Sequence, residues 1–255
     1  MQDKYVGDAG DFGKYGLLRF IFDPKYGCKL KLGINWYHVP NDGNEEDGNK
    51  IGYLLDENDN FCMREADSGL YSVLKKIVKP RRNNKVVESH GTRVIDEVQH
   101  NSILPANTLY YDSVLHKEGN RGKWHEEAIK KLQDSDIVFL DPDNGLEPNN
   151  GSIKHVFDSE VVDYYQGQRK SLIIYQHGNR GKHRDKFKKI KKMLNTPDIF
   201  YLHYRRYGVR YYLFILRTEH KNFIERRINE LFLSNWCKTM NNRWKPHFEK
   251  GRFPI

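Results

Sequence analysis

Two carboxylates and an amide follow one of the apolar runs of the chain. Residues 137–140 are Ile-Val-Phe-Leu, and residues 141–145 are Asp-Pro-Asp-Asn-Gly. An apolar run closed by turn-forming residues predicts a buried β-strand. Open α/β sheets bind their ligands outside the carboxyl ends of the strands, so Asp141, Asp143 and Asn144 are candidate catalytic residues. An ordinary turn that needs only one aspartate and the glycine is the alternative interpretation.

Three other segments predict strands that end in polar residues. They cover residues 30–39, 108–112 and 171–178. The polar residues at or just after their ends are His38, Asp42, Asp112, Tyr175 and His177. Because the carboxyl ends of parallel strands share one edge of a sheet, we expect these side chains to gather beside Asp141. Each also has a structural interpretation, such as a turn cap at Asp112 or a hydrogen bond from His177 to a loop carbonyl.

The segment before the first of these strands is rich in glycine and carries charge. Residues 7–16 are Gly-Asp-Ala-Gly-Asp-Phe-Gly-Lys-Tyr-Gly, and they lead into an apolar stretch that ends at Phe22. Such glycines indicate a tight bend or a backbone that lies close to another part of the protein. We expect Asp8 or Asp11 to cap the helix that follows. If this helix begins at the same edge of the sheet, Lys14 joins the candidate catalytic residues; a solvated lysine is the alternative.

The charge balance favours a polyanionic partner. The 255 residues include 43 Lys and Arg against 34 Asp and Glu, a formal net charge of +9, together with 16 Tyr that could stack on bases. Nucleic acid is the simplest such partner, and general basicity is the alternative. No apolar run approaches the roughly 20 residues of a membrane helix. Three scattered cysteines and a first segment unlike a signal peptide favour the reducing cytoplasm.

Two basic segments are candidates for binding nucleic acid. One is a predicted helix over residues 182–194 with the residues just before it, and the other is a predicted hairpin tip near Tyr207. The candidate phosphate contacts are Arg180, Lys182, Arg184, Lys188, Arg205 and Arg206. Lysines and arginines on an exposed face bind phosphates without reading sequence. A solvated amphipathic helix is the alternative for the first segment.

Strands and helices alternate along most of the chain. Besides the strands above, the pattern predicts a hairpin over residues 199–216. Predicted helices cover residues 70–79, 91–99, 121–133, 182–194 and 220–233, and another begins with Ser159 as its N-cap. This order predicts a Rossmann-like α/β fold, with a mostly parallel sheet, helices on both faces and a C-terminal antiparallel hairpin. We expect a single domain over residues 1–255, with residues 41–107 as a candidate insertion of helices and loops.

The layout resembles the class I S-adenosylmethionine-dependent methyltransferases. In that fold the sheet also ends in an antiparallel hairpin, and Asp141-Pro142-Asp143-Asn144 stands where those enzymes carry an Asp-Pro-Pro-Tyr type motif. The opening Asp8-Ala9-Gly10-Asp11 is similar to the His-Ala-Gly-Asn opening of the large-subunit ribosomal RNA adenine-N6 methyltransferase family. The resemblance implies that residues 141–144 hold a target amino group for methyl transfer.

Three departures from that pattern concern the cofactor and the target. The strand at residues 30–39 lacks the acidic and glycine-rich loop that lies against the cofactor. Asp143 and Asn144 replace the second proline and the aromatic residue that stacks on the base. Asp8 and Asp11 stand where the family has His and Asn, so each change adds negative charge.

Methyl transfer to a base in RNA or DNA is the first functional hypothesis. Asp141 and Asn144 would accept hydrogen bonds from an exocyclic amine, and Tyr175 would stack on a base that is unpaired or flipped out. The residues expected to bind the S-adenosylmethionine cofactor are His38, Asp42 and Asp112.

Metal-dependent hydrolysis of a nucleic acid or nucleotide is the second hypothesis. Asp8, Asp11, Asp141 and Asp143 would bind Mg²⁺ or Mn²⁺ through carboxylate oxygens. His177 would act as the general base, and Lys14 would stabilise charge on the phosphate. A catalytically inactive nucleic-acid-binding protein is the third hypothesis.

Overall fold

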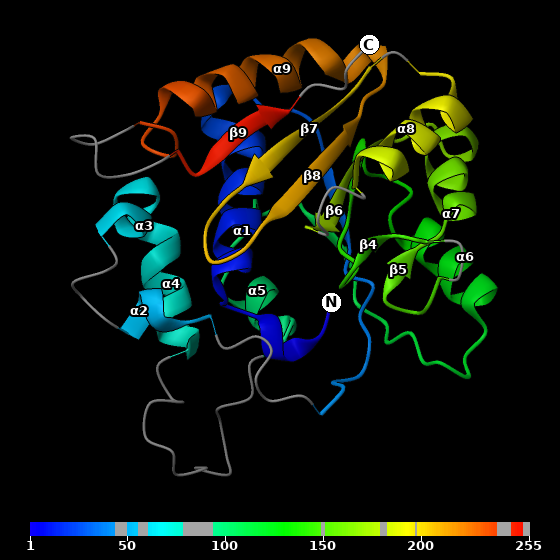
Figure 1. Cartoon of the computed structure of the whole chain (residues 1–255), viewed down its shortest axis with the longest axis horizontal. Helices are drawn as coiled ribbons and strands as arrows, with labels where there is room; N and C mark the ends of the chain where they lie inside the picture. Colours follow the sequence, from blue (N-terminus) through cyan, green and yellow to red (C-terminus); the bar gives the residue numbers. More distant parts are fainter. Residues whose placement is uncertain are drawn as a thin grey trace.

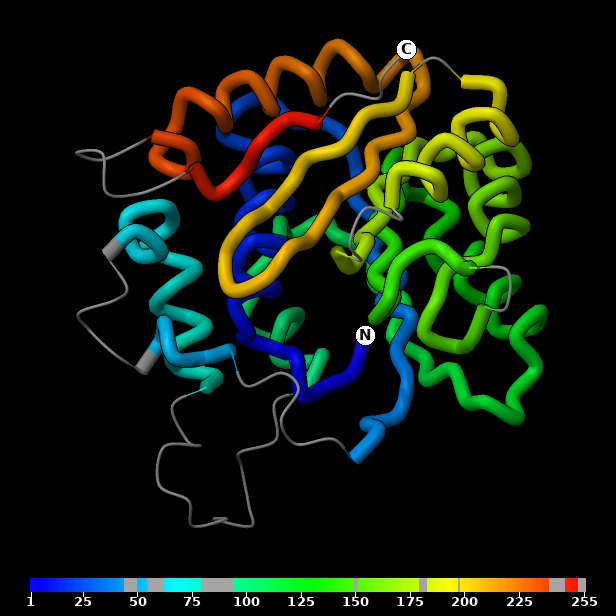
Figure 2. The backbone as a smooth tube through the Cα atoms, in the orientation of Figure 1, coloured from blue at the N-terminus to red at the C-terminus, as the bar shows by residue number. Residues whose placement is uncertain are grey.

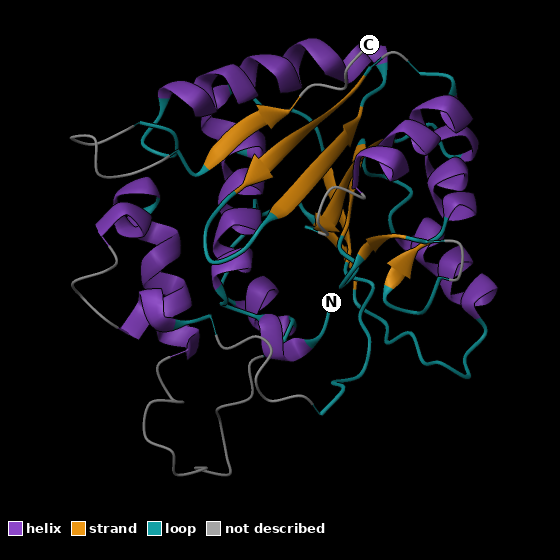
Figure 3. Ribbon diagram, viewed as in Figure 1, coloured by secondary structure: helices purple, strands orange, loops and turns teal. Residues whose placement is uncertain are grey.

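A seven-stranded sheet forms the centre of the protein (Figures 1 and 3). The computed structural model describes residues 1–43, 50–55, 61–78, 94–148, 151–178, 183–196, 198–238 and 246–251. The strand order is β2-β1-β3-β6-β8-β7-β9. The strands are β1 (Leu32–Asn35), β2 (Leu109–Tyr111), β3 (Ile137–Leu140), β6 (Ser171–His177), β7 (Ile199–Tyr204), β8 (Arg210–Ile215) and β9 (Phe248–Gly251). A separate two-stranded sheet joins β4 (Gly145–Leu146) to β5 (His155–Val156).

The first half of the sheet is parallel, and the second half is antiparallel. Strands β2, β1, β3 and β6 run in one direction, with Ile34 beside Phe139 and Phe139 beside Ile173. Every residue of β1 and β3 is buried, as expected for strands covered by helices on both faces. Strand β8 pairs antiparallel with β6 and β7, and β9 adds an antiparallel edge strand beyond β7.

Helices cover both faces of this sheet and enclose two hydrophobic cores. On one face, α1 (Ala9–Phe22), α4 (Ser68–Val78) and α9 (Thr218–Leu233) bury their apolar residues in a shared core. On the other face lie α6 (Arg121–Lys131), α7 (Asp158–Val162) and α8 (His183–Leu194), which contribute to the second core. The predicted Rossmann-like α/β class is therefore confirmed. Among the helices that the structure describes, none combines the length and apolar character needed to cross a bilayer.

The segment between β1 and β2 is largely helical in its described parts. It contains α2 (Gly52–Leu55), α3 (Phe61–Ala66), α4 and α5 (Asp96–His100). Leu70 and Leu74 of α4 and Val98 of α5 lie in the same core as α1. The candidate insertion at residues 41–107 is thus joined to the core around α1 by its described helices.

Several element boundaries differ from the sequence expectation. Strand β1 ends at Asn35, since Tyr37 adopts a left-handed backbone with φ of 45°. Ser159 is not an N-cap, because α7 begins at Asp158 and the Phe157 N–H donates to the Glu160 carboxylate instead. Strand β9 was not predicted, since its four residues become a strand only by pairing with β7.

Candidate functional site

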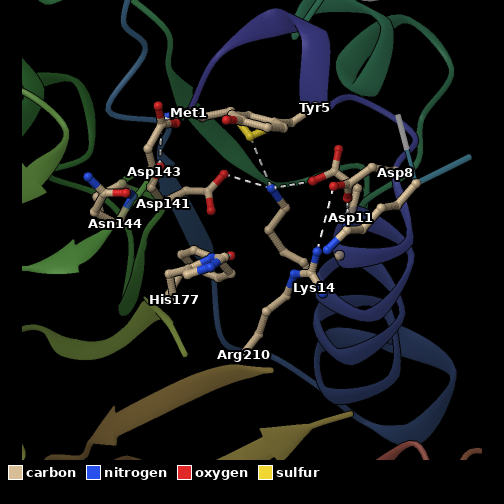
Figure 4. Close-up of a pocket in the computed structure, with 14 residues that line it drawn as sticks. Met1, Tyr5, Asp8, Asp11, Lys14, Asp141, Asp143, Asn144, His177 and Arg210 are labelled. Atoms are coloured by element: carbon tan, nitrogen blue, oxygen red, sulfur yellow. Dashed lines mark hydrogen bonds and ion pairs between the residues drawn. The ribbon is translucent and has the colours of Figure 1, made fainter. Parts of the chain in front are cut away.

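A cavity of about 230 Å³ opens at the carboxyl ends of β3 and β6, beside the start of α1 (Figure 4). Its lining residues come from segments that are far apart in sequence: Met1, Tyr5, Asp8, Gly10, Asp11, Lys14, Lys50, Asp141, Pro142, Asp143, Asn144, Tyr175, His177 and Arg210. Every predicted catalytic residue lines this cavity, as do Asp8, Asp11 and Tyr175. The carboxyl edge of the parallel strands is therefore where these side chains gather, as expected from the sheet.

Helix α1 carries acidic and basic groups into the cavity. Asp8 is its N-cap, and the Asp8 Oδ1 accepts a hydrogen bond of 2.8 Å from the Asp11 N–H. This satisfies one of the free N–H groups of the first turn. One turn later the Lys14 side chain lies beside Asp11, because residues three apart share a helix face.

The glycines of α1 let the helix lie directly on other side chains. A Cβ at Gly10 would come within 2.3 Å of the Arg210 guanidinium, and one at Gly13 would come within 2.5 Å of the Tyr204 ring. The Tyr204 hydroxyl donates to the Ala9 carbonyl at 3.0 Å. The close approach predicted from the glycine spacing is thus observed, and it places Arg210 at the cavity.

Lys14 lies between two carboxylates at the centre of the site. Its Nζ is 2.7 Å from Asp11 Oδ1 and 2.7 Å from Asp141 Oδ2, and all three side chains are buried (Figure 4). Burial opposes the charged lysine, but the two carboxylates overcome it and raise its pKa. Burial also raises the pKa of Asp141, and the attraction of Lys14 offsets only part of that effect. The solvated-lysine alternative is therefore wrong for Lys14.

The α-amino group of Met1 binds at the ends of β1 and β3. It donates to the Tyr37 carbonyl at 2.7 Å and the Asp141 carbonyl at 3.1 Å, and it lies 3.0 Å from Asp143 Oδ1. The Met1 Sδ accepts a hydrogen bond of 3.3 Å from Lys14 Nζ. The amino terminus thus lies inside the molecule, beside β3 (Figure 2). Sequence reasoning missed this contact, because no local pattern indicates where the first residue docks.

Asp143 is held by the first two residues of the chain. Gln2 Nε2 donates to Asp143 Oδ2 at 2.6 Å, in addition to the ion pair with Met1. Burial alone would raise the pKa of Asp143, but the Met1 ammonium and Gln2 lower it below its usual range. Asp143 is therefore ionised and faces the ammonium group of Met1.

Two acceptors remain open to the cavity. Among the described residues, neither Asp141 Oδ1 nor the side-chain amide of Asn144 takes part in a hydrogen bond. Gln176 holds the turn that carries Asp141 and Asn144. Its Nε2 donates to the Asn144 carbonyl, and its Oε1 accepts from the Leu146 N–H. Gly145 has a φ of 93°, and a Cβ there would collide with Gln176.

His177, Tyr175 and Arg210 line the opposite wall of the cavity. His177 and Arg210 are paired residues on the neighbouring strands β6 and β8, so their side chains share one face of the sheet. The Tyr175 hydroxyl lies 3.4 Å from His177 Nδ1, and burial raises the pKa of Tyr175 to about 12. Tyr175 is thus a neutral hydrogen-bonding ring, while His177 is exposed.

The three predicted cofactor residues lie outside the cavity lining. His38 Nδ1 is 3.0 Å from the Asp112 carbonyl, and His38 Nε2 is 3.3 Å from Asp3, so the ends of β1 and β2 are joined. Asp42 pairs with Lys154 at 2.8 Å and with Lys4. The strand-end residues therefore form two groups rather than the single group that we expected.

The four predicted metal ligands do not converge. Lys14 lies between Asp11 and Asp141, Arg210 faces Asp8 at 3.6 Å, and Met1 pairs with Asp143. Within the described ranges, no three His, Cys, Asp or Glu side chains are grouped as a metal ion would need. The site neutralises its carboxylates with ammonium and guanidinium groups of the protein.

Among the described residues, the predicted phosphate contacts lie on helix α8 and in the turn between β7 and β8. Arg184 and Lys188 are exposed on α8, which packs against the second core. Arg205 and Arg206 lie in the turn between β7 and β8, and the first residue of α8, His183, stacks on Tyr211 of β8 beside this turn. Arg180 and Lys182 fall outside the described residues.

Comparison with known proteins yields a similarity of overall structure only. No protein-family model matches the chain, and no curated protein matches it. Protein LPL1258 from Legionella pneumophila, a crystal structure assigned to family DUF519, is similar over 90% of this chain and 94% of its own. The identity is 8% and the TM-score is 0.43. A similarity of this degree identifies no activity.

Proposed function

We propose that this protein transfers a methyl group from S-adenosylmethionine to an exocyclic amine of a base in RNA or DNA. The observation that carries the proposal is the binding of Met1 in the cavity. The α-ammonium and thioether groups of Met1, which correspond to the α-ammonium and the sulfur centre of the methionine part of that cofactor, are already accommodated beside Asp141. The protein's own methionine therefore serves as a chemical stand-in for the amino-acid end of the cofactor.

The acceptors around Met1 fit the cofactor's ammonium group. The Tyr37 and Asp141 carbonyls and the Asp143 carboxylate would hold it, as they hold the ammonium of Met1. Met1 must then move out when the cofactor binds. The cofactor supplies an electrophilic methyl group on a positively charged sulfur, which the ionised Asp143 attracts. In this proposal the carbonyl of Tyr37, two residues beyond β1, takes the cofactor-binding role that was expected of His38, Asp42 and Asp112.

Asp141 and Asn144 are suited to hold the target amine. Asp141 Oδ1 and the Asn144 amide oxygen are open acceptors that would receive the two N–H groups of an exocyclic amine. These hydrogen bonds turn the nitrogen lone pair toward the methyl group. The cofactor would supply the methyl group and leave as S-adenosylhomocysteine, and the target nitrogen would have to lose one proton. Asp141, whose pKa is raised by burial, is placed to receive that proton.

Lys14 acts as a positioning residue for Asp141. Its ammonium fixes Oδ2 at 2.7 Å and so leaves Oδ1 directed to the cavity. Tyr175 offers a ring on the opposite wall of the cavity for stacking of a base, and such contacts contribute about 1–3 kcal/mol per base. The base must be unpaired or flipped out to reach this depth.

The test is binding of S-adenosylmethionine with a tritiated methyl group, followed by incubation with single-stranded RNA and DNA. We expect bound cofactor and label on the nucleic acid. Asp141→Asn should bind the cofactor and transfer at least about a hundredfold more slowly, since a proton acceptor contributes about 10²–10⁴. Absence of cofactor binding at millimolar concentration would overturn the proposal. Cleavage that EDTA abolishes would instead support the metal-dependent hydrolase.

A further inference from the structure

Two cations from separate segments converge on Gly208 in the β7–β8 turn. A Cβ built at Gly208 would lie 3.4 Å from Lys50 Nζ and 3.4 Å from Arg210 Nη1. Both residues also line the cavity that contains Asp141. Because Gly208 has no side chain, no Cβ of this residue fills the space between the two cations.

Arg210 is held rigidly in this position. It is buried, its Nη1 donates to the Arg206 carbonyl at 3.1 Å, and its Nη2 lies 3.6 Å from Asp8. Its guanidinium rests on Gly10, where a Cβ would come within 2.3 Å of Nε. A guanidinium is always charged and presents donors in a fixed plane, which suits phosphate oxygens.

The charged groups around Gly208 have an excess of positive charge, which favours the binding of an anion. Asp8 is the carboxylate that faces Arg210, and no described carboxylate pairs with the exposed Lys50. His177 is paired with Arg210 on the neighbouring strand β6. It adds a third hydrogen-bond donor at the cavity wall. Two convergent cations beside one carboxylate repel each other until an anion binds between them.

We propose that the gap between Lys50 and Arg210 at Gly208 binds a backbone phosphate of the nucleic-acid strand whose base enters the cavity. The assumption that the ligand is a nucleic-acid strand rests on the proposed function. The exposed Tyr207 and the half-buried Arg206, in the same turn, continue this surface away from the cavity. The phosphate contact fixes the register of the strand, while Asp141 and Asn144 hold the amine of one nucleotide.

The experiment measures binding of a fluorescein-labelled single-stranded oligonucleotide to the full chain by anisotropy, over a range of salt concentrations. Lys50→Glu is compared with Lys123→Glu, which changes the net charge equally at a lysine that is 74% exposed on α6. We expect Lys50→Glu to weaken binding by about tenfold and to lower the slope of log affinity against log salt by about 0.7. Lys50→Arg should retain wild-type binding.

Equal losses in Lys50→Glu and Lys123→Glu would overturn the site, because general charge would then explain binding. Competition by millimolar inorganic phosphate that releases the oligonucleotide completely would also overturn it, since the site would then recognise a free phosphate and not a strand. Failure of S-adenosylmethionine to bind would overturn the proposed function alone, because these anisotropy measurements contain no cofactor.

Discussion

Lys14 Nζ and Asp141 Oδ2 lie 2.7 Å apart across 127 residues of sequence. This ion pair joins the first helix to the strand end at the centre of the sheet, and both side chains are buried. The pair matters both for stability and for the site. Lys14 neutralises the buried charge of Asp141, and by binding Oδ2 it leaves Oδ1 of Asp141 facing the cavity.

Replacement of Lys14 by Met should destabilise the fold by about 3–5 kcal/mol, since it leaves buried carboxylates without their cation. Burial already raises the pKa of Asp11 and of Asp141. Without Lys14 the pKa values of both carboxyl groups rise further, so the folded state keeps protons that the unfolded state has released. The loss should therefore grow as the pH rises above the usual carboxyl range near 3.8.

Urea unfolding of this variant at several pH values measures the effect. Lys123→Met, at the 74% exposed position, is the matched control and should change the free energy of unfolding by less than about 0.5 kcal/mol. An equal effect in the two variants would mean that the ion pairs of Lys14 do not stabilise the fold.

Gly13→Ala should destabilise the fold by about 1–3 kcal/mol through overpacking. The new methyl group would lie 2.5 Å from the Tyr204 ring, so helix α1 or strand β7 must move. Gly52→Ala is the control, because no atom of the described residues lies within 4 Å of the added methyl and alanine favours a helix over glycine by about 0.5–1 kcal/mol. Thermal melting should show opposite shifts, and a stabilised Gly13→Ala would contradict the observed packing.

His203→Phe should make the protein less sensitive to acid. Burial and the nearby Arg205 lower the pKa of His203 to about 4, and its ring stacks on Tyr211. Because the pKa of His203 is lower in the folded state than in the unfolded state, only the unfolded state takes up the proton between about pH 6.5 and pH 4. The free energy of unfolding therefore falls as the pH falls through this interval. Phenylalanine keeps the stacking and removes this proton.

Chemical unfolding between pH 7 and pH 4 tests this expectation. The stability of His203→Phe should fall less steeply over this interval than that of the wild type. The exposed His100→Phe serves as the control for a ring replacement on the surface. Parallel curves for His203→Phe and the wild type would show that His203 does not titrate as its surroundings indicate.

Asp143→Asn should weaken S-adenosylmethionine binding by about tenfold or more. A hydrogen bond to a charged group contributes about 1.5–3 kcal/mol, and Asp143 is the carboxylate that pairs with the ammonium of Met1. Calorimetric titration of the cofactor measures the change, with Asp163→Asn, a 53% exposed aspartate, as the control. Oligonucleotide binding should stay constant, and an unchanged cofactor affinity would rule out Asp143 as its ligand.

Local patterns predicted most of the sheet. The apolar run at residues 137–140 and the paired runs at residues 199–216 are strands β3, β7 and β8, because a buried strand needs continuous apolar residues. Strand β9 and the early end of β1 escaped prediction. Phe248–Gly251 is short and polar in part, and only the exposed edge of β7 makes it a strand.

Part of the residue composition of the site was also predictable from the sequence. Asp141, Asp143, Asn144 and His177 follow from the rule that parallel strands end at one edge. Lys50 was not predicted, and Arg210 was expected only in the basic hairpin tip and not in the cavity. Their place in the cavity depends on two glycines, at residues 10 and 208, that admit the guanidinium and leave the gap open.

The sequence by itself therefore determined the α/β class, the buried strand before Asp141 and the presence of acidic and basic groups at the strand ends. Only the tertiary structure decided which charges pair. Lys14 meets Asp141, Met1 meets Asp143, and His38 turns to Asp112 instead of the cavity. Strand periodicity is local, but an ion pair depends on how the segments pack, because charges interact strongly only when folding brings them within a few ångströms in a dry interior.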